Sequence, residues 1–477
     1  MSVAPELSNE SLIVCENSQG SNIRATLLRM TRYVVSFEVY NPYSILQLSE
    51  VLNIFKIVIN NNTIYSGRAI ITGIVNTGLL LVCEASLDEE SWLDVDLLSP
   101  VTQLERLASD FERLIDDWAK IEKVSPEMKI VISDMQALLR DMRRWLEQVE
   151  HSLRTVTSPE RQKLELSIIE KLNKLVLPIT NEIFQKFEDI AGAIQEEVKA
   201  VHRAYARRQL HPFLLASPFI YRTFQKPLGY AGDYEMVNMI LRDPTEGASL
   251  FAKVINTRFV NGAPAEAHRN RIKYLSQALR TETRKRAKLG QLTHIFNLGC
   301  GPAKEIQDFL TFDDLCDRAT FTLLDFNEET LAYTGKLLNE LKMKHQRQTP
   351  ITMIQRSVHQ ILKEGRRGTE IGRNSLYDIV YCAGLFDYLS DRICLRLMDI
   401  FYEIVAPGGL LIATNVEASN PDRQMMEYIM DWHLIYRDSK QLLALSPQKA
   451  PRENCRVLCD ETKVNLFLEV RKPLGDG

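Results

Sequence analysis

The chain has 477 residues, of which 45% are hydrophobic and 25% are charged, and its formal net charge is −4. These values are ordinary for globular protein and suggest two to four domains. They give no reason to expect nucleic acid or an anionic membrane as a main partner. The longest apolar runs are also far too short to span a bilayer.

The N-terminal residues 1–20 are polar and are expected to be flexible. They contain neither a basic segment nor an apolar segment, so we expect no signal peptide and a cytoplasmic location. Eight cysteines are scattered along the chain without a CxxC pair. This spacing favours free thiols in a reducing compartment, and we predict no metal site.

Residues 21–98 are rich in β-branched and aromatic residues, which is typical of strands. Asparagine-containing breaks at 60–62 and 76–78 separate these runs and favour hairpin turns. The segment therefore predicts a small β-barrel.

Residues 99–269 change to a helical pattern, in which apolar residues recur every three or four positions. These residues are Leu104, Leu107, Phe111, Leu114, Trp118, Met135, Leu138, Leu139, Met142, Trp145, Ile168, Ile169, Leu172 and Leu175. Pro126 and Pro159 are placed where helices begin, and Pro178 is expected to kink or end a helix. We predict a bundle of long helices with its Trp and Met residues in the core.

Residues 270–477 alternate between strands and helices and close with two strands at 455–472. Alternating β and α units form a parallel sheet with helices on both faces. The prediction is an α/β fold, with a doubly wound, Rossmann-like sheet that ends in a β-hairpin.

The first strand of this region, 293–299, runs directly into Gly299-Cys300-Gly301 before a helix. Glycines at such a turn let a ligand approach the backbone closely. The third glycine of a dinucleotide fingerprint is absent, since Ala303 or a later residue stands at that place. This departure disfavours a pyrophosphate-binding loop.

The second strand ends at Asp325, 26 residues after Gly299. A carboxylate at this place can accept hydrogen bonds from both hydroxyls of a ribose. The alternative is a helix N-cap, provided by Asp325 or by Asn327. The preceding strand favours ribose binding over capping.

Two further landmarks follow: the strand 377–382 ends at Ala383 and Gly384, and a Pro-Gly-Gly turn at 407–409 leads into the next strand. In this order, the motifs of residues 270–477 resemble class I S-adenosylmethionine-dependent methyltransferases. The resemblance implies S-adenosyl-L-methionine as cofactor, with the glycines on its methionine part, Asp325 on the ribose and residues 357–358 beside the adenine. Asn297 departs from the family, which commonly has an acidic residue there. The implied cofactor-binding residues are Asn297, Gly299, Cys300, Gly301, Asp325, Phe326, Ser357, Val358, Ala383 and Gly384.

The strings at 226–234, 384–389, 415–421 and 431–437 are similar to bacterial proteins of 3-hydroxypalmitic acid methyl ester biosynthesis. This resemblance implies a small, hydrophobic acceptor such as a hydroxy fatty acid carboxylate. Two alternatives stay open. One is methyl transfer to a protein or another small metabolite, and the other is a non-catalytic sensor or assembly protein that binds the cofactor.

Candidate residues on the acceptor side are the polar groups of those strings, namely Tyr230, Asp233, Tyr234, Tyr388, Asn415 and His433. The functional interpretation is that the turn at 226–234 forms a lid over the acceptor pocket. The structural alternative is a turn that docks the helical segment. His433, expected on a helix, is equally compatible with a packing role.

The N-terminal β region faintly resembles PilZ domains, which bind cyclic di-GMP through an RxxxR pair and a [DN]xSxxG string. Here Arg24 and Arg29 are five apart, Arg29 and Arg32 are three apart, and the later string is replaced by 73–78. Both motifs are damaged, so we expect no cyclic di-GMP binding. The β and helical regions are instead the expected contact surfaces for a homodimer or a protein partner.

Overall fold

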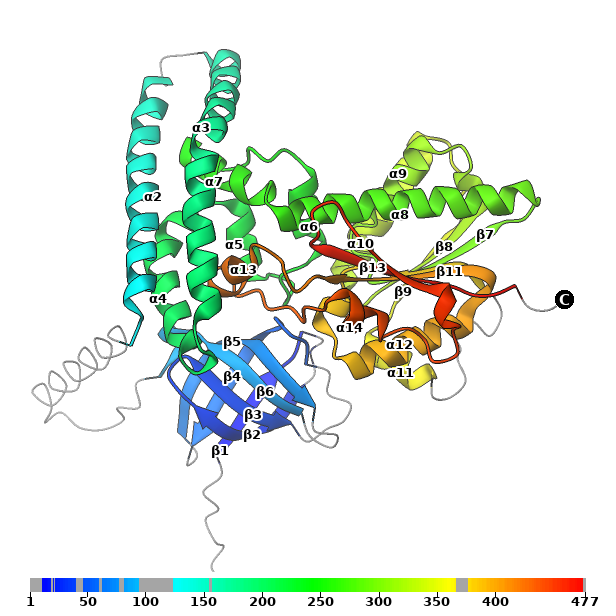
Figure 1. Ribbon diagram of the computed structural model, residues 1–477, viewed down its shortest axis with the longest axis horizontal. Coiled ribbons are helices and arrows are strands. Elements are labelled where there is room, and N and C mark those ends of the chain that lie inside the picture. Colours follow the sequence, from blue (N-terminus) through cyan, green and yellow to red (C-terminus); the bar gives the residue numbers. More distant parts are fainter. Residues whose placement is uncertain are drawn as a thin grey trace, which may run out of the picture. The chain divides into compact units, whose positions relative to one another are not determined.

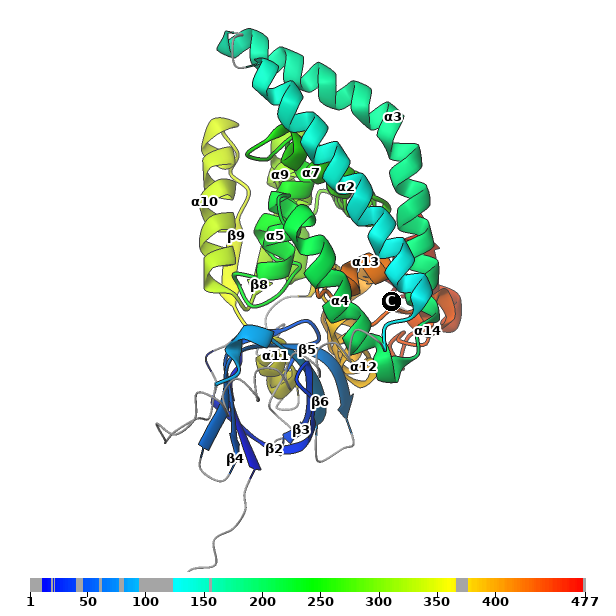
Figure 2. The same ribbon diagram turned by 90° about the vertical axis from the view of Figure 1, so that its left-hand side faces the viewer.

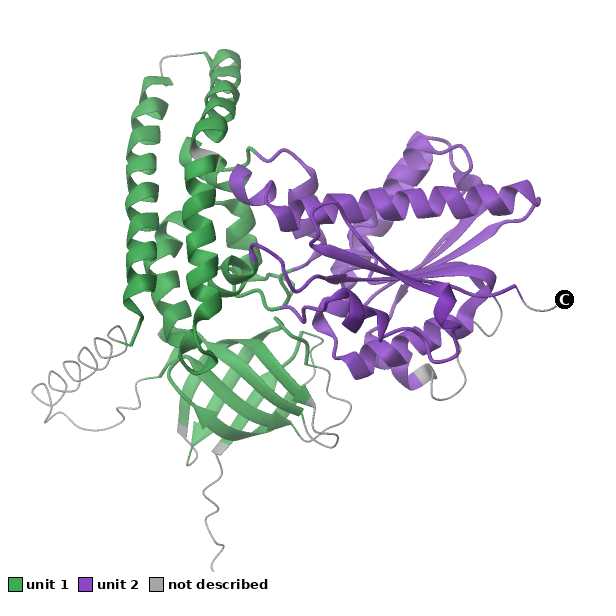
Figure 3. Cartoon of the chain, in the orientation of Figure 1, with its two compact units in different colours: residues 1–231, 245–256, 423–433 green, residues 232–244, 257–422, 434–477 purple. Residues whose placement is uncertain are grey.

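The computed structural model describes residues 11–18, 20, 22–39, 46–59, 62–76, 81–93, 123–153, 157–365 and 376–474. They form two compact units (Figure 3). Unit 1 comprises Met1–Ala231, Thr245–Asn256 and Arg423–His433, and unit 2 comprises Gly232–Pro244, Thr257–Asp422 and Leu434–Gly477. Unit 2 thus includes parts of the region 99–269, and unit 1 includes a segment from within 270–477. The apolar residues between Leu104 and Trp118 lie outside the described residues.

Unit 1 contains a closed antiparallel barrel with the strand order β1-β2-β3-β6-β5-β4 (Figure 2). The strands are β1 (Ser11–Glu16), β2 (Asn22–Met30), β3 (Val34–Val39), β4 (Val51–Ile59), β5 (Asn62–Asn76) and β6 (Leu81–Leu87). The predicted barrel is therefore confirmed, although residues 60–61 and 77–78 of the expected turns lie outside the described residues. The first strand, Ser11–Glu16, corrects the expectation of flexibility for that part of residues 1–20. Ile13 and Cys15 are fully buried, but this alternation is too short to stand out in a polar segment.

The helices of unit 1 are α2 (Pro126–Ser152), α3 (Ser158–Ala193), α4 (Glu196–Leu214), α5 (Pro218–Gln225) and the short α13 (Arg423–Tyr428). Two of them, α2 and α3, begin at the predicted positions near Pro126 and Pro159. Pro126 occupies the first turn of α2, where the Ser125 hydroxyl accepts a hydrogen bond from the Met128 N–H at 3.2 Å. Pro178 does not end its helix, because α3 continues past it for 15 residues to Ala193. A proline removes only one donor, and a long helix can tolerate this with a bend.

The predicted apolar stripe of the helices is correct only in part. Met135 and Leu139 are buried in α2, but Trp145 is 48% exposed and Leu146 takes the buried position instead. Met128, Ile132, Met135, Leu139 and Leu146 are buried at intervals of three, four or seven residues, and Trp145 falls one residue out of that phase. Leu175 of α3, also expected on the core face, is 71% exposed.

Unit 2 is built on a seven-stranded sheet with the order β12-β13-β11-β10-β7-β8-β9. Its strands are β7 (Thr293–Leu298), β8 (Ala319–Asp325), β9 (Ile351–Gln355), β10 (Tyr377–Cys382), β11 (Val405–Val416), β12 (Cys455–Cys459) and β13 (Asn465–Arg471). The first five are parallel, whereas β13 runs antiparallel to both β11 and β12. The doubly wound sheet and its closing hairpin are thus confirmed.

Helices cover both faces of this sheet (Figure 1). On one face, α8 (Ala263–Lys288), α9 (Lys304–Phe312) and α10 (Glu328–Lys344) pack with Ile295 of β7. On the other, α11 (Val358–Gly365), α12 (Asp391–Ile404) and α14 (Ser439–Leu443) pack with Phe296. The winding direction reverses between β7 and β10, and a reversal of this kind opens a crevice at the carboxyl ends of the strands.

The core on the α9 face supplies a stability test with an internal control. Phe309 is fully buried and lies edge-on to Phe321 with ring centroids 6.1 Å apart, whereas Phe312 of the same helix is 73% exposed. Phe309→Ala should lower the free energy of unfolding by about 3–5 kcal/mol, because it leaves a cavity. Phe312→Ala should change it by less than about 0.5 kcal/mol. Urea titrations followed by circular dichroism measure both, and equal effects would contradict this core assignment.

Candidate functional site

The loop after β7 exposes its backbone at the crevice. Gly299 and Gly301 adopt φ values of 73° and 49°, in the left-handed region that favours glycine. The N–H groups of Gly299 and Cys300 are tied to the Leu324 carbonyl at 2.8 and 3.1 Å. A Cβ placed on Gly301 would meet no heavy atom within 4 Å, so space is open beside this backbone. The loop is therefore fixed to β8 by hydrogen bonds, and its backbone at Gly301 is accessible to a ligand.

Asp325, at the end of β8, faces this loop. Its Oδ2 accepts a hydrogen bond from the Gly301 N–H at 3.2 Å and its Oδ1 accepts one from the Asn327 N–H at 3.0 Å. The N-cap of α10 is Asn327, whose side chain accepts from the Thr330 N–H at 2.9 Å. Burial raises the pKa of the Asp325 carboxyl to about 6. The capping alternative therefore belongs to Asn327, and Asp325 is a buried carboxylate beside the loop.

A polar cluster lies behind the loop. Tyr381 donates a hydrogen bond to Glu305 Oε1 at 2.7 Å, and Asn297 Nδ2 lies 3.5 Å from the same oxygen. Burial raises the pKa of the Glu305 carboxyl. Asn297 is 2% exposed, and its Oδ1 has no hydrogen-bond partner within the described part of the chain. An orphaned buried acceptor is rare and is consistent with a bound donor.

Arg271 of α8 reaches the end of β10. A Cβ on Gly384 would lie 2.9 Å from a terminal nitrogen of the Arg271 guanidinium, which would have to move, and the φ of 82° also favours glycine there. Burial lowers the pKa of Arg271, while the charges of Asp387, Glu305 and Tyr388 favour its protonated form. Arg271 is not recognisable as a site residue from the sequence, because a basic residue on an amphipathic helix is usually solvated. Glu305 was also missed, although its place in the first turn after the glycine loop was an available signal.

The remaining predicted cofactor residues flank these groups. The Ser357 hydroxyl accepts a hydrogen bond from the Gln360 N–H at 3.3 Å at the start of α11, and Val358 packs in the core beneath. Phe326, which follows Asp325, and Ala383, which follows β10, are half-buried. All of them follow the carboxyl ends of β8, β9 or β10.

Two of the acceptor-side candidates lie near the same edge of the sheet. Asn415 is fully buried, donates to the Ile435 carbonyl at 2.9 Å and accepts from Arg437 at 2.5 Å. These bonds give it a holding role. Tyr388 is half-buried at the end of the 3₁₀ turn Phe386–Tyr388, and its charge is coupled to Arg271.

The turn at 226–234 divides between the two units after Ala231, so Tyr230 belongs to unit 1, and Asp233 and Tyr234 to unit 2. Asp233 is the N-cap of α6 (Tyr234–Leu241) and accepts from the Met236 N–H at 2.7 Å. Tyr234 donates to Glu329 at 2.9 Å. These bonds fasten α6 to unit 2.

His433 belongs to unit 1 and does not lie on a helix, which corrects the sequence interpretation. The helix α13 ends before it, and Asp431 adopts a left-handed φ of 53°, which an α-helix cannot accommodate. His433 Nε2 lies 3.1 Å from Asp431 Oδ1, and burial lowers the pKa of the imidazole. The candidates Tyr230 and His433 are thus in one unit, and Asp233, Tyr388 and Asn415 are in the other.

The chain resembles several solved structures at low identity. One is a possible exported protein from Bordetella parapertussis, with 17% identity, a TM-score of 0.40 and coverage of 53% of this chain and 86% of that one. The N-methyltransferase NodS from Bradyrhizobium japonicum has 13% identity and a TM-score of 0.30, and the match covers 53% of this chain and 99% of that one. Magnesium protoporphyrin IX methyltransferase from Synechocystis has 8% identity and a TM-score of 0.34, and the match covers 57% of this chain and 99% of that one. No protein-family model and no curated protein matches the chain.

Two further properties concern the cysteines and the helices of the chain. All eight cysteines are free thiols, as predicted, and only Cys459 among them is exposed. In the described part of the chain, no helix combines the length and the apolar character needed to cross a membrane.

The raised pKa of Asp325 predicts a pH-dependent stability. The folded-state value of about 6 lies above the ordinary 3.8, so the stability linked to the protonated carboxyl is complete below pH 3.8 and is lost as pH rises through 6. Asp325→Asn should therefore gain stability relative to the natural protein between pH 4 and pH 7, by up to about 3 kcal/mol. Urea denaturation across this range measures the difference, with Asp314→Asn as control, since the Asp314 side chain is fully exposed. A difference that does not change with pH would contradict the burial of an ionisable group here.

Proposed function

We propose that this protein is an S-adenosyl-L-methionine-dependent methyltransferase. The observation that carries the proposal is the pairing of Asp325 with the open backbone of Gly301 at the crevice where the sheet reverses direction. This arrangement offers a carboxylate for a ribose diol beside a loop that a ligand can approach closely. A non-catalytic sensor that binds the cofactor would share these features, so methyl transfer itself, tested below, distinguishes the two.

The residues around the crevice fit the chemical groups of this cofactor. Asp325 keeps acceptor capacity for the ribose hydroxyls, since each carboxylate oxygen can accept more than one hydrogen bond. The orphaned Asn297 Oδ1 suits the ammonium group, and the Arg271 guanidinium suits the carboxylate of the methionine part. Ser357 and Val358 are the proposed neighbours of the adenine. When bound, the cofactor supplies a methyl group already activated by its sulfonium.

The chain's own contribution is positioning. The carboxyl edge of the sheet is fixed by buried hydrogen bonds, and orientation of two reactants can supply roughly 7–11 kcal/mol of a barrier in favourable cases. A carboxylate acceptor needs no general base at neutral pH, whereas a hydroxyl or an amine can require one. The chemistry therefore needs few catalytic side chains.

The cofactor assignment is tested by Asp325→Ala. Loss of the carboxylate should weaken binding of S-adenosylhomocysteine by about 1.5–3 kcal/mol, because it removes charge-assisted hydrogen bonds to the ribose. Isothermal titration calorimetry measures the affinity. The exposed Glu340→Ala on α10 is the control of equal charge change and should bind as the natural protein does. Unchanged affinity in Asp325→Ala would remove the ribose assignment.

For the acceptor, we propose a small hydrophobic molecule that carries a carboxylate, such as a hydroxy fatty acid. The sequence strings at 226–234, 384–389 and 415–421 support this class. Tyr388 is the proposed acceptor-side residue, because Asn415 and Asp233 already hold the backbone. Methyl transfer to a protein is the competing candidate.

The acceptor proposal is tested with methyl-labelled cofactor and a cell extract. Label should enter a small molecule extractable into organic solvent rather than precipitated protein. Tyr388→Phe should lower turnover about tenfold or more while S-adenosylhomocysteine affinity is retained, since the hydroxyl would act on the acceptor. Tyr377→Phe, at the opposite end of β10, should leave turnover unchanged. Label in protein, or full turnover of Tyr388→Phe, would contradict the acceptor class or the residue, respectively.

A further inference from the structure

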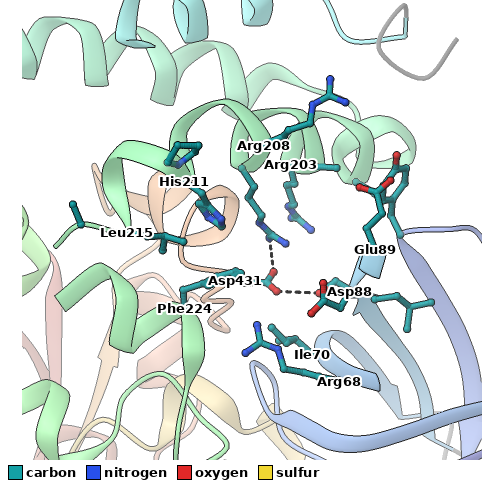
Figure 4. Close-up of a pocket in the computed structure, with 18 of the residues that line it drawn as sticks. Arg68, Ile70, Asp88, Glu89, Arg203, Arg208, His211, Leu215, Phe224 and Asp431 are labelled. Atoms are coloured by element: carbon teal, nitrogen blue, oxygen red, sulfur yellow. Dashed lines mark hydrogen bonds and ion pairs between the residues drawn. The ribbon is translucent and has the colours of Figure 1, made fainter. Parts of the chain in front are cut away.

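Unit 1 contains a cavity of about 1220 Å³ that belongs to none of the groups described above. Its walls come from the barrel strands β5 and β6, the helices α2, α4 and α5, and Asp431 (Figure 4). All of its lining residues belong to unit 1. Its volume is larger than that of most small-molecule sites, so it can admit a ligand of substantial size.

Arginines converge on this cavity. Arg203 and Arg207 come from α4 and Arg68 comes from β5, and Figure 4 shows Arg68 and Arg203 on either side of Asp431. Arg207 is held by the Asp431 carboxylate at 2.6 Å and the Tyr428 carbonyl at 2.7 Å. One wall of the cavity is therefore a fixed cationic surface.

The carboxylates of the lining do not neutralise this surface. Six arginines and five carboxylates line the cavity, and four of the carboxylates lie within 4.0 Å of an arginine. These four are Glu89, Glu147, Glu150 and Asp431. In the described part of the chain, Arg68 has no carboxylate within ion-pair distance and donates to the Gln225 carbonyl at 3.1 Å. It is a cation that a ligand could engage.

A buried donor near Arg68 also lacks an acceptor. The Arg203 side chain is 12% exposed and pairs with Glu427 at 3.1 Å through one terminal nitrogen. Its Nε is buried and makes no hydrogen bond within the described residues. A buried guanidinium nitrogen without an acceptor is costly, and a bound oxyanion would satisfy it.

The local potential is positive as well. Lys226, behind Asp431, is 1% exposed and donates to the Met430 carbonyl at 3.2 Å. Burial lowers its pKa to about 7, and the positive charges of Arg68 and Arg207 lower it further, against the opposing effect of Asp431. Lys226 is thus close enough to Arg68 and Arg207 for their charges to repel, and an anion in the cavity would favour the charged form of all three.

The rest of the lining is apolar and partly aromatic. The Arg68 guanidinium lies 5.2 Å from the centroid of the Phe224 ring, which contacts the His211 ring at 4.5 Å. Ile70 and Leu215 also line the cavity. Such walls suit a flat or apolar body joined to the anionic group.

We propose that this cavity binds a small organic phosphate, with its phosphate group on Arg68 and Arg203 and its apolar body against Phe224. Phosphate is favoured over a carboxylate because its three oxygens can serve guanidinium groups from opposite sides. The site is independent of the proposed cofactor crevice, since no residue is shared between them.

The test uses the full chain and phenyl phosphate as the probe. Isothermal titration calorimetry should show binding at submillimolar concentration, weaker binding of inorganic phosphate and benzoate, and none of phenol. Arg68→Gln and Arg203→Gln should each weaken the affinity about tenfold or more. Arg144→Gln, an exposed residue of α2 outside the cavity, loses the same charge and should stay within twofold. Saturating S-adenosylhomocysteine should leave the affinity unchanged.

Each other outcome overturns a stated part of the proposal. No binding of phenyl phosphate removes the site, and equal binding of benzoate removes the preference for phosphate. An equal loss in Arg144→Gln shows attraction by net charge alone. Circular dichroism checks the fold of each variant. If Arg203→Gln unfolds, Arg68→Gln decides, because the Arg68 side chain donates to the Gln225 carbonyl and forms no ion pair in the described residues.

Discussion

The buried guanidinium of Arg437 fixes the carboxyl edge of the unit 2 sheet. Its side chain is 2% exposed and donates to the carbonyls of Phe386 and Leu389 at 2.9 and 2.6 Å, to Asn415 at 2.5 Å and to Asp391 at 2.9 Å. These acceptors come from the loop after β10, from β11 and from the start of α12. One side chain therefore determines where three elements of the site end, and its removal would leave several buried carbonyls without a donor.

Asp387 is the second part of this arrangement. Its Oδ1 accepts from the Val416 N–H at 2.6 Å and its backbone carbonyl accepts from the Ile435 N–H at 2.6 Å. Burial raises the pKa of this carboxyl, while Arg271 and Arg437 stabilise its ionised form. A hydrogen bond from the backbone thus fixes the position of the Asp387 carboxylate, which is adjacent to Tyr388. Preorganised charge of this kind requires no rearrangement during reaction, which suits a reaction that depends on positioning.

The sequence was sufficient for features that depend on local pattern. Alternating strands and helices predicted the doubly wound sheet. The glycine loop and Asp325, which the sequence singled out, are joined by a hydrogen bond at the ends of their strands. Residues that act through tertiary contacts were not found. Arg271 and Arg437 are charged, and a charged residue is usually solvated, so nothing local distinguishes a buried one. Conversely, Asn415 and Asp233 attracted attention as polar residues in unusual strings, yet their bonds hold the backbone.

The cavity lined by arginines is likewise not recognisable from the sequence, because it depends on tertiary contacts. Its wall includes Asp431, which is distant in sequence from the barrel and the helices that complete it. The segment Arg423–His433 belongs to unit 1, although both of its flanks belong to unit 2. It is anchored there by Glu188, which accepts from the N–H groups of Gln424 and Met425 at 2.7 Å each.

Only six positions then separate Asp431 from Arg437, which fixes the carboxyl edge of the other sheet. A chain this short spans roughly 20 Å even when fully extended. Within this length the chain passes from unit 1, which holds Asp431, to unit 2, which holds Arg437. Neither Asp431 nor Arg437 is recognisable as an anchor in the linear sequence, because each depends on partners more than 20 residues away.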